Sequence, residues 1–168
     1  MIQTKIDKKS ILQDLSRFSF GATSAIITSL ALIVGLDSIG SNPKMSIIGA
    51  LLALGIADNI ADSLGIHVYR ESQFCNHRGN KIYTLSNFLT RFSITLIFVL
   101  LVYFLPMQLA YWSAIVIGIG LLCLLSYFIA LYHNASPLWE IVEHVGVAVI
   151  VLVASNFLGH AITGMFGA

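Results

Sequence analysis

The feature that most constrains this chain is a long stretch without charge, since residues 92–139 contain no Asp, Glu, Lys or Arg. A helix that crosses a bilayer needs about 20 mostly apolar residues, so this stretch is too long for one span and long enough for two. Pro106 divides it, because proline removes a helix hydrogen bond and clashes with the preceding turn. Over the whole chain 10% of the residues are charged, against about 25% in soluble domains. We therefore expect an integral membrane protein rather than a soluble enzyme, a nucleic-acid-binding protein or a disordered tail.

Apolar segments of spanning length recur along the rest of the chain. Together they predict an all-α protein with five transmembrane helices, at about residues 18–36, 45–67, 86–105, 108–132 and 138–160. Asn42-Pro43 and residues 133–137 have the composition of turns. A four-span alternative, with the third segment re-entrant, is also compatible with the pattern. Residues 1–17 form a cytoplasmic N-terminal segment, either an amphipathic helix on the membrane surface or a polar tail.

The distribution of Lys and Arg predicts the orientation. With five spans, one side of the membrane receives eight of these residues: Lys5, Lys8, Lys9, Arg17, Arg70, Arg78, Lys81 and Arg91. The opposite side receives Lys44 alone. Because cytoplasmic flanks are enriched in Lys and Arg, we expect the N-terminus in the cytoplasm and the C-terminus on the other side. The short loops favour a bacterial inner membrane.

Two aspartates lie inside the second predicted span. Asp58 and Asp62 are four residues apart and therefore share one face of a helix. An aspartate at the bilayer centre costs about 2.5–3.5 kcal/mol on insertion scales, and two carboxylates side by side also repel each other. A divalent cation or a shared proton would relieve this conflict, and carboxylate oxygens suit Mn²⁺, Fe²⁺, Mg²⁺ and Ca²⁺. The structural alternative is that the pair bonds neighbouring helices or lies at a hydrated rim.

A second group of possible ligands begins the fifth predicted span. Glu140, Glu143 and His144 are spaced to share one side of a helix, and carboxylates with a histidine are suitable metal ligands. The predicted topology places them on the cytoplasmic side, where they would form an entry site. Acidic residues also stabilise a helix N-terminus without any metal, so this alternative stays open.

Two segments resemble the vacuolar iron transporter family. Residues 21–36 (GATSAIITSLALIVGL) resemble its first-helix motif, roughly G-L-S-D-G-L-x-x-P-F-A-L-A-A-G-L. Residues 55–73 (GIADNIADSLGIHVYRESQ) resemble its second helix, G-I-A-E…S-M…Y…K-S-Q. The chain looks like a divergent member without the long cytoplasmic metal-binding helices between spans two and three. Asp58 matches the family's second-helix glutamate, Ser24 stands where the family has an aspartate, and Asp62 has no counterpart.

The resemblance implies a homodimer that exports Fe²⁺ or Mn²⁺ from the cytoplasm, in exchange for protons. Combined with the residues, it predicts a divalent cation transporter with no enzymatic activity, no permanently bound cofactor and no nucleic-acid partner. Asp58 and Asp62 would form the intramembrane site, and Glu140, Glu143 and His144 the entry site. The alternative function is a non-transporting membrane protein, an assembly partner or a sensor, that retains the transporter fold.

Overall fold

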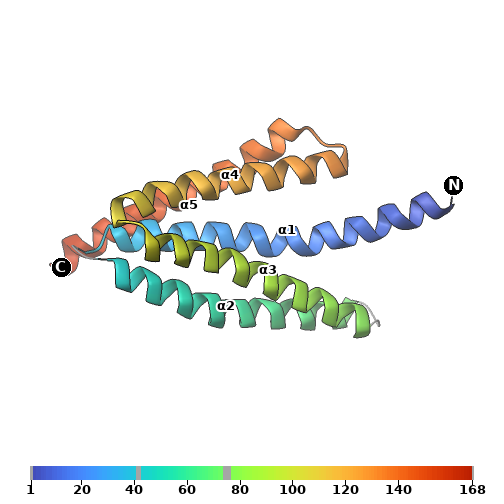
Figure 1. Cartoon of the computed structure of the whole chain (residues 1–168), viewed down its shortest axis with the longest axis horizontal. Helices are drawn as coiled ribbons and strands as arrows, with labels where there is room; N and C mark the ends of the chain where they lie inside the picture. Colours follow the sequence, from blue (N-terminus) through green and yellow to red (C-terminus); the bar gives the residue numbers. More distant parts are fainter. Residues whose placement is uncertain (1, 41–42, 74–76, 168) are drawn as a thin grey trace.

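The fold is described by a computed structural model that covers residues 2–40, 43–73 and 77–167, with side chains from residue 18 onward except 70, 73 and 77–83. In these ranges the secondary structure consists of five α-helices, with no strand (Figure 1). They are α1 (Ile2–Asp37), α2 (Lys44–Gln73), α3 (His77–Phe104), α4 (Met107–His133) and α5 (Pro137–Phe166). The all-α, five-helix prediction is therefore confirmed.

Each helix contains a segment that is long and apolar enough to cross a membrane. These segments are Phe18–Asp37, Lys44–Tyr69, Thr84–Phe104, Met107–His133 and Pro137–Phe166. They agree with the predicted spans to within a few residues, except that α5 continues past the predicted end at residue 160. Because α3 is one unbroken helix, the re-entrant alternative does not describe it. The structure therefore supports an integral, multi-pass membrane protein.

Helix α1 occupies the middle of the bundle, with α2 and α3 on one side and α4 and α5 on the other (Figure 1). Its apolar side chains at near-helical spacing, Ile26, Leu30 and Ile33, are almost completely buried. The same helix continues back to Ile2 without a break. Residues 2–17 therefore belong to the helix that contains the first span and do not form a separate helix. Position on the membrane surface for this segment stays a prediction.

The helices meet closely at the end of the bundle that holds the C-terminus. A Cβ atom built on Gly159 of α5 would lie 2.5 Å from the carbonyl oxygen of Gly35 on α1. One turn later, the Thr163 hydroxyl lies 3.2 Å from the carbonyl oxygens of Ser38 and Ile39 and 3.1 Å from that of Gly159, so its one proton has three possible acceptors. Contacts this close require glycine on α5, because any side chain at this position would push the two backbones apart.

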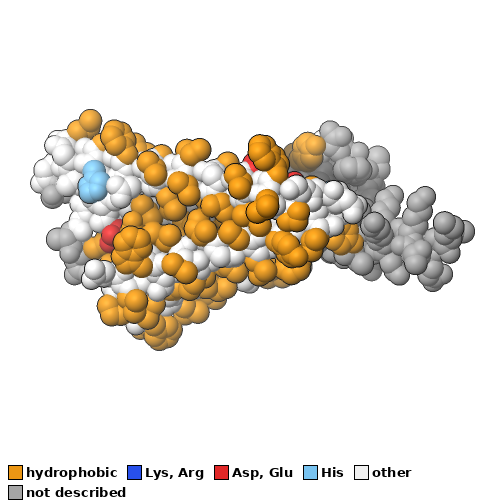
Figure 2. Space-filling view, turned by 90° about the horizontal axis from the view of Figure 1, so that it is seen from above, with side chains coloured by type: hydrophobic (Ala, Val, Ile, Leu, Met, Phe, Trp, Pro, Cys, Tyr) orange, Lys and Arg blue, Asp and Glu red, His pale blue; other side chains and the backbone are white. Residues whose placement is uncertain are grey.

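Helices α3 and α4 are joined at the same end by a short turn around Pro106, as the sequence predicts. The ammonium group of Lys44, at the start of α2, donates to the Leu105 carbonyl oxygen of this turn at 3.0 Å. From here α3 and α4 diverge toward the other end of the bundle (Figure 1). Hydrophobic side chains spread over the helices on the face shown in Figure 2, as expected for a surface in contact with lipid.

Candidate intramembrane charged site

The candidate site lies where α2 packs along α3. The inner side of α2 is a buried row at intervals of four residues, formed by Ile47, Leu51, Gly55, Asn59 and Ser63. A Cβ atom on Gly55 would approach Thr95 Cγ2 to 3.0 Å, so the small residue lets the helices come close. Asp58 and Asp62 each precede a member of this row and therefore lie on its flank.

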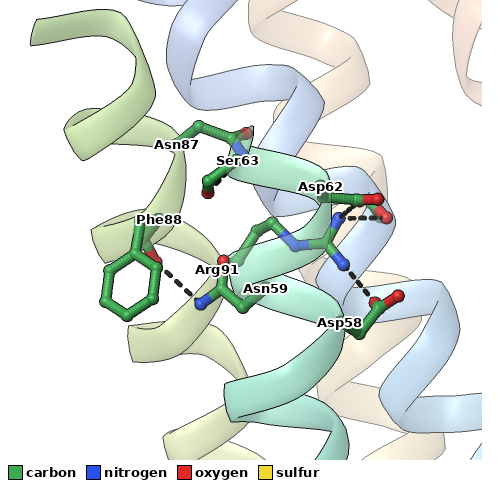
Figure 3. Close-up of polar contacts among 8 residues, drawn as sticks. Asp58, Asn59, Asp62, Ser63, Asn87, Phe88 and Arg91 are labelled. Atoms are coloured by element: carbon green, nitrogen blue, oxygen red, sulfur yellow. Dashed lines mark hydrogen bonds and ion pairs between the residues drawn. The ribbon is translucent and has the colours of Figure 1, made fainter. Parts of the chain in front are cut away.

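Two buried amides tie α2 to α3 beside the aspartates. Asn59 Nδ2 donates to the Phe88 carbonyl oxygen at 3.0 Å, and Asn87 Nδ2 donates to Ser63 Oγ at 3.4 Å (Figure 3). Both amides are almost completely buried. Polar contacts between helices are stable in lipid because no water competes for the donors and acceptors. They fix the register that brings α3 against the carboxylates.

Arg91 of α3 lies between the two aspartates. Its Nη2 atom is 2.5 Å from Asp58 Oδ2, and its Nη1 atom is 2.5 Å from Asp62 Oδ2 (Figure 3). Nη1 also donates to the hydroxyl of Ser24 on α1 at 2.5 Å. One guanidinium group therefore joins three helices through two ion pairs and a hydrogen bond. We call Asp58, Asp62 and Arg91 the charged cluster.

Arg91 belongs to the third span rather than to its cytoplasmic flank, with which the count of Lys and Arg groups it. Its side chain is 4% exposed and lies inside the Thr84–Phe104 span. Seven of the nine Lys and Arg residues remain on the predicted inner flank, and Lys44 is on the other. The count therefore still predicts that the N-terminus lies in the cytoplasm. The available signal was that Arg91 is the one cationic residue within predicted span three, while two aspartates of span two needed a counter-charge.

The charged cluster does not balance its own charge. One guanidinium and two carboxylates leave one net negative charge when all three groups are ionised. The carboxylate side chains are each 37% exposed, whereas the arginine is enclosed. The site therefore presents excess negative charge on the outward side of the cluster, and keeps its positive charge inside.

Some polar atoms at the cluster have no protein partner in the described part of the chain. They are Asn59 Oδ1, Asn87 Oδ1 and Arg91 Nε, all buried. A cavity of about 10 Å³ adjoins Asn59 and Arg91, and its lining includes Ser29 of α1. A buried water needs about 10–15 Å³ and two to four polar partners. The cavity thus has the size and the polarity to hold one water beside the guanidinium.

The structure brings together only part of the second predicted site. His144 Nδ1 lies 4.0 Å from Glu140 Oε2 and 3.0 Å from the hydroxyl of Ser126 on α4, whereas Glu143 is exposed. Helix α5 is on the other side of α1 from α2 (Figure 1). Among the described side chains, no three or more His, Cys, Asp or Glu residues are grouped so that they could hold a metal ion. Metal binding at either site stays a prediction.

Comparison with known proteins found no matching family model, no matching curated protein and no matching solved structure. The resemblance to vacuolar iron transporters therefore stays a prediction based on residues 21–36 and 55–73, and the geometry of the charged cluster is the basis for assigning a function.

Proposed function

We propose that this protein is a homodimeric transporter of a divalent cation, Fe²⁺ or Mn²⁺, with the charged cluster as its intramembrane site. The observation that carries the proposal is the surplus aspartate. A single carboxylate would neutralise Arg91, and the second adds a charge that no described cation compensates. Because an uncompensated charge inside a membrane is expensive, intramembrane carboxylates of this kind mark ion or proton pathways.

Arg91 acts in this proposal as an internal counter-charge. It holds the two carboxylates in place when no ion is bound, and it leaves their outward sides exposed. One cluster carries a net charge of −1, so it is balanced by one proton. Two clusters that face each other across a dimer carry −2, which is the charge that a divalent cation balances. Exchange of a cation for protons follows from competition for the same oxygens.

The outward face of α2 is suited to such a dimer. One exposed row of α2 at intervals of four consists of small residues: Gly49, Ala53, Ala57, Ala61 and Gly65. A second exposed row, Leu52, Ile56, Ile60 and Leu64, consists of large apolar residues. Cβ atoms on Gly49 and Gly65 would meet nothing within 4 Å, so the face is open along its length. Small faces let helices approach closely in lipid. Pairing of two copies here would also cover the half-exposed carboxylates, which lie on the adjoining flank of α2.

The proposed direction is export from the cytoplasm, with the N-terminus inside. Seven Lys and Arg residues on one flank support this orientation, and the odd number of spans places the two termini at opposite ends of the bundle (Figure 1). A reporter fused to the C-terminus should be active outside the cytoplasm. A C-terminal reporter that is active only in the cytoplasm would contradict the orientation.

The decisive experiment replaces the carboxylates without changing their size. Asp58→Asn and Asp62→Asn should each strongly reduce Fe²⁺ or Mn²⁺ uptake into proteoliposomes, and should reduce the rise in melting temperature that these ions cause. Asp37→Asn, at the far end of α1, is the matched control and should leave both unchanged. Uptake should also fall as the pH is lowered, because protons compete with the cation for the same carboxylate oxygens. Wild-type transport by the double variant Asp58→Asn, Asp62→Asn would refute the proposed mechanism.

The second candidate is a non-transporting membrane protein that keeps the same fold. It is favoured by the position of the Arg91 guanidinium, which fills the space between Asp58 and Asp62 where a cation would bind. On this alternative the charged cluster only fastens α1, α2 and α3 together. No divalent cation would then raise the melting temperature of the wild-type protein, and the asparagine variants would lose no transport because there is none.

A further inference from the structure

A groove of about 520 Å³ opens between α1, α3 and α4, away from the charged cluster. Its volume lies within the range of small-molecule sites, about 300–1,000 Å³. Apolar side chains form almost all of its lining, including Phe18 and Ile26 of α1, Ile97 of α3, and Leu124 and Phe128 of α4. The described polar residues in the lining are Thr90 and Ser93, neither of which is charged. Apolar spaces of this kind do not bind water well.

The groove follows from the divergence of two helices. Helices α3 and α4 are close at the Pro106 turn and separate toward the opposite end, and α1 runs between them (Figure 1). The space between α3 and α4 therefore widens toward the membrane rim where the α1 span begins. It is closed toward the Pro106 end, where the three helices pack on one another.

The length of the groove matches one leaflet of a bilayer. Its lining on α1 begins at Phe18, the first residue of the span, and ends at Ile26. Eight helical steps rise about 12 Å, and half of a hydrocarbon core is about 15 Å. A transmembrane helix of a second copy would need a groove along the full span, and is about 10–12 Å wide. The half-length groove with an open rim instead fits a single hydrocarbon chain.

We propose that this groove binds one acyl chain of a bilayer lipid, taken from the leaflet at the Phe18 end of the bundle. The chain lies in the space between α3 and α4, against α1, and its headgroup stays at the rim. The lipid fills a space that would otherwise lack packing partners, and it holds α3 and α4 at their observed separation. The site is independent of the proposed cation transport.

The test compares two small, exposed residues near the middle of their spans. Ser93→Phe places a ring inside the groove, whereas Ala154→Phe places one on the exposed face of α5. After exchange into lipid-free detergent, native mass spectrometry should find retained phospholipid on the wild type and on Ala154→Phe, and should find most of it lost from Ser93→Phe. No retained lipid on the wild type, or equal retention by both variants, would overturn the proposal.

A second measurement on the unmodified protein keeps the proposal testable if Ser93→Phe fails to fold. Phospholipid with a photoreactive group on its acyl chain is incorporated, the protein is washed with detergent, and the sample is then illuminated. Labelling should concentrate in residues 89–97 and 121–128, above that of residues 149–157 of α5, which lie outside the groove. Equal labelling of the three segments would show ordinary lipid contact only. Cross-links between two copies at the groove would show that a second protein chain occupies it, and would also overturn the proposal.

Discussion

At the scale of single residues, the contacts of Arg91 explain how two aspartates are accommodated inside a membrane. The sequence predicts the aspartate pair, its spacing and its common helix face, because these depend only on helical periodicity. It does not predict the partner, because the rule that counts Lys and Arg near span ends treats Arg91 as a flanking charge rather than as a counter-charge inside the span. Which face of α3 meets α2 depends on the packing of Asn59, Ser63 and Asn87, and periodicity in one helix carries no information about a neighbour.

Replacement of Arg91 should destabilise the protein more than neutralisation of the whole cluster. Arg91→Met leaves two carboxylates together without a counter-charge, and removal of one partner from a buried ion pair costs about 3–5 kcal/mol. The triple variant Arg91→Met, Asp58→Asn, Asp62→Asn removes all three charges and should recover much of the loss. Thermal unfolding in detergent measures both. A triple variant as unstable as Arg91→Met would show that shape, and not charge, sets the stability of the cluster.

The contact between Glu140 and His144 changes what we expect of the predicted entry site. If the entry site exists, it depends on this pair, so Glu140→Gln with His144→Ala should weaken Mn²⁺ binding and leave the fold intact. Glu143→Gln, at the exposed neighbouring position, is the control and should have a smaller effect. Calorimetric titration of the purified protein provides the measurement. Unchanged affinity in the double variant would show that the pair does not bind the cation and that Glu140 only stabilises the N-terminal end of α5.

At the scale of the helices, the sequence predicts the five helices and their approximate bounds well, because local hydropathy and Pro106 determine where each apolar segment begins and ends. It does not predict that residues 2–17 continue α1 as one helix. A change from polar to apolar residues near Phe18 marks the membrane boundary, but the backbone hydrogen bonds of a helix do not depend on that boundary. The close contact between α5 and α1 is likewise absent from the hydropathy pattern, although it depends on one residue, Gly159.

Gly159→Ala should therefore lower stability although alanine is the better helix former. The new methyl group would meet the Gly35 carbonyl oxygen at 2.5 Å and the Ser38 Cβ at 2.6 Å, so α5 must move away from α1. Overpacking of this kind costs about 1–3 kcal/mol. Gly146→Ala on the same helix meets no atom within 4 Å and should be neutral or slightly stabilising. Equal melting temperatures for the two variants would contradict the close approach.

At the scale of the whole molecule, the five helices leave the charged cluster half open. The α2 face that would cover it in a homodimer is small and exposed, whereas the cluster's inner side is closed by α1 and α3. The sequence predicts a dimer only through the family resemblance. The structure adds that a row of alanine and glycine residues lies on the outward face of α2, which is a property of the assembled bundle.

Ala61→Leu should weaken the proposed dimer, because the larger side chain keeps two α2 helices apart. Ala154→Leu, on the exposed face of α5, is the matched control and should leave association unchanged. Counting of bleaching steps for labelled protein in lipid bilayers measures the oligomeric state directly. A wild-type protein that is monomeric both in bilayers and in mild detergent would exclude a cation site shared between two copies.

The unequal charge of the cluster has an electrical consequence. Asp58 lies near the middle of the Lys44–Tyr69 span and Asp62 one turn closer to its Tyr69 end, so the net charge of the cluster is located inside the membrane field. Transfer of one elementary charge across the full membrane is worth about 2.3 kcal/mol for every 100 mV. A cation or proton that reaches these carboxylates from either side crosses a part of that potential difference. Occupancy of the cluster should then depend on voltage, and the energised state of the membrane would set how often the site is filled.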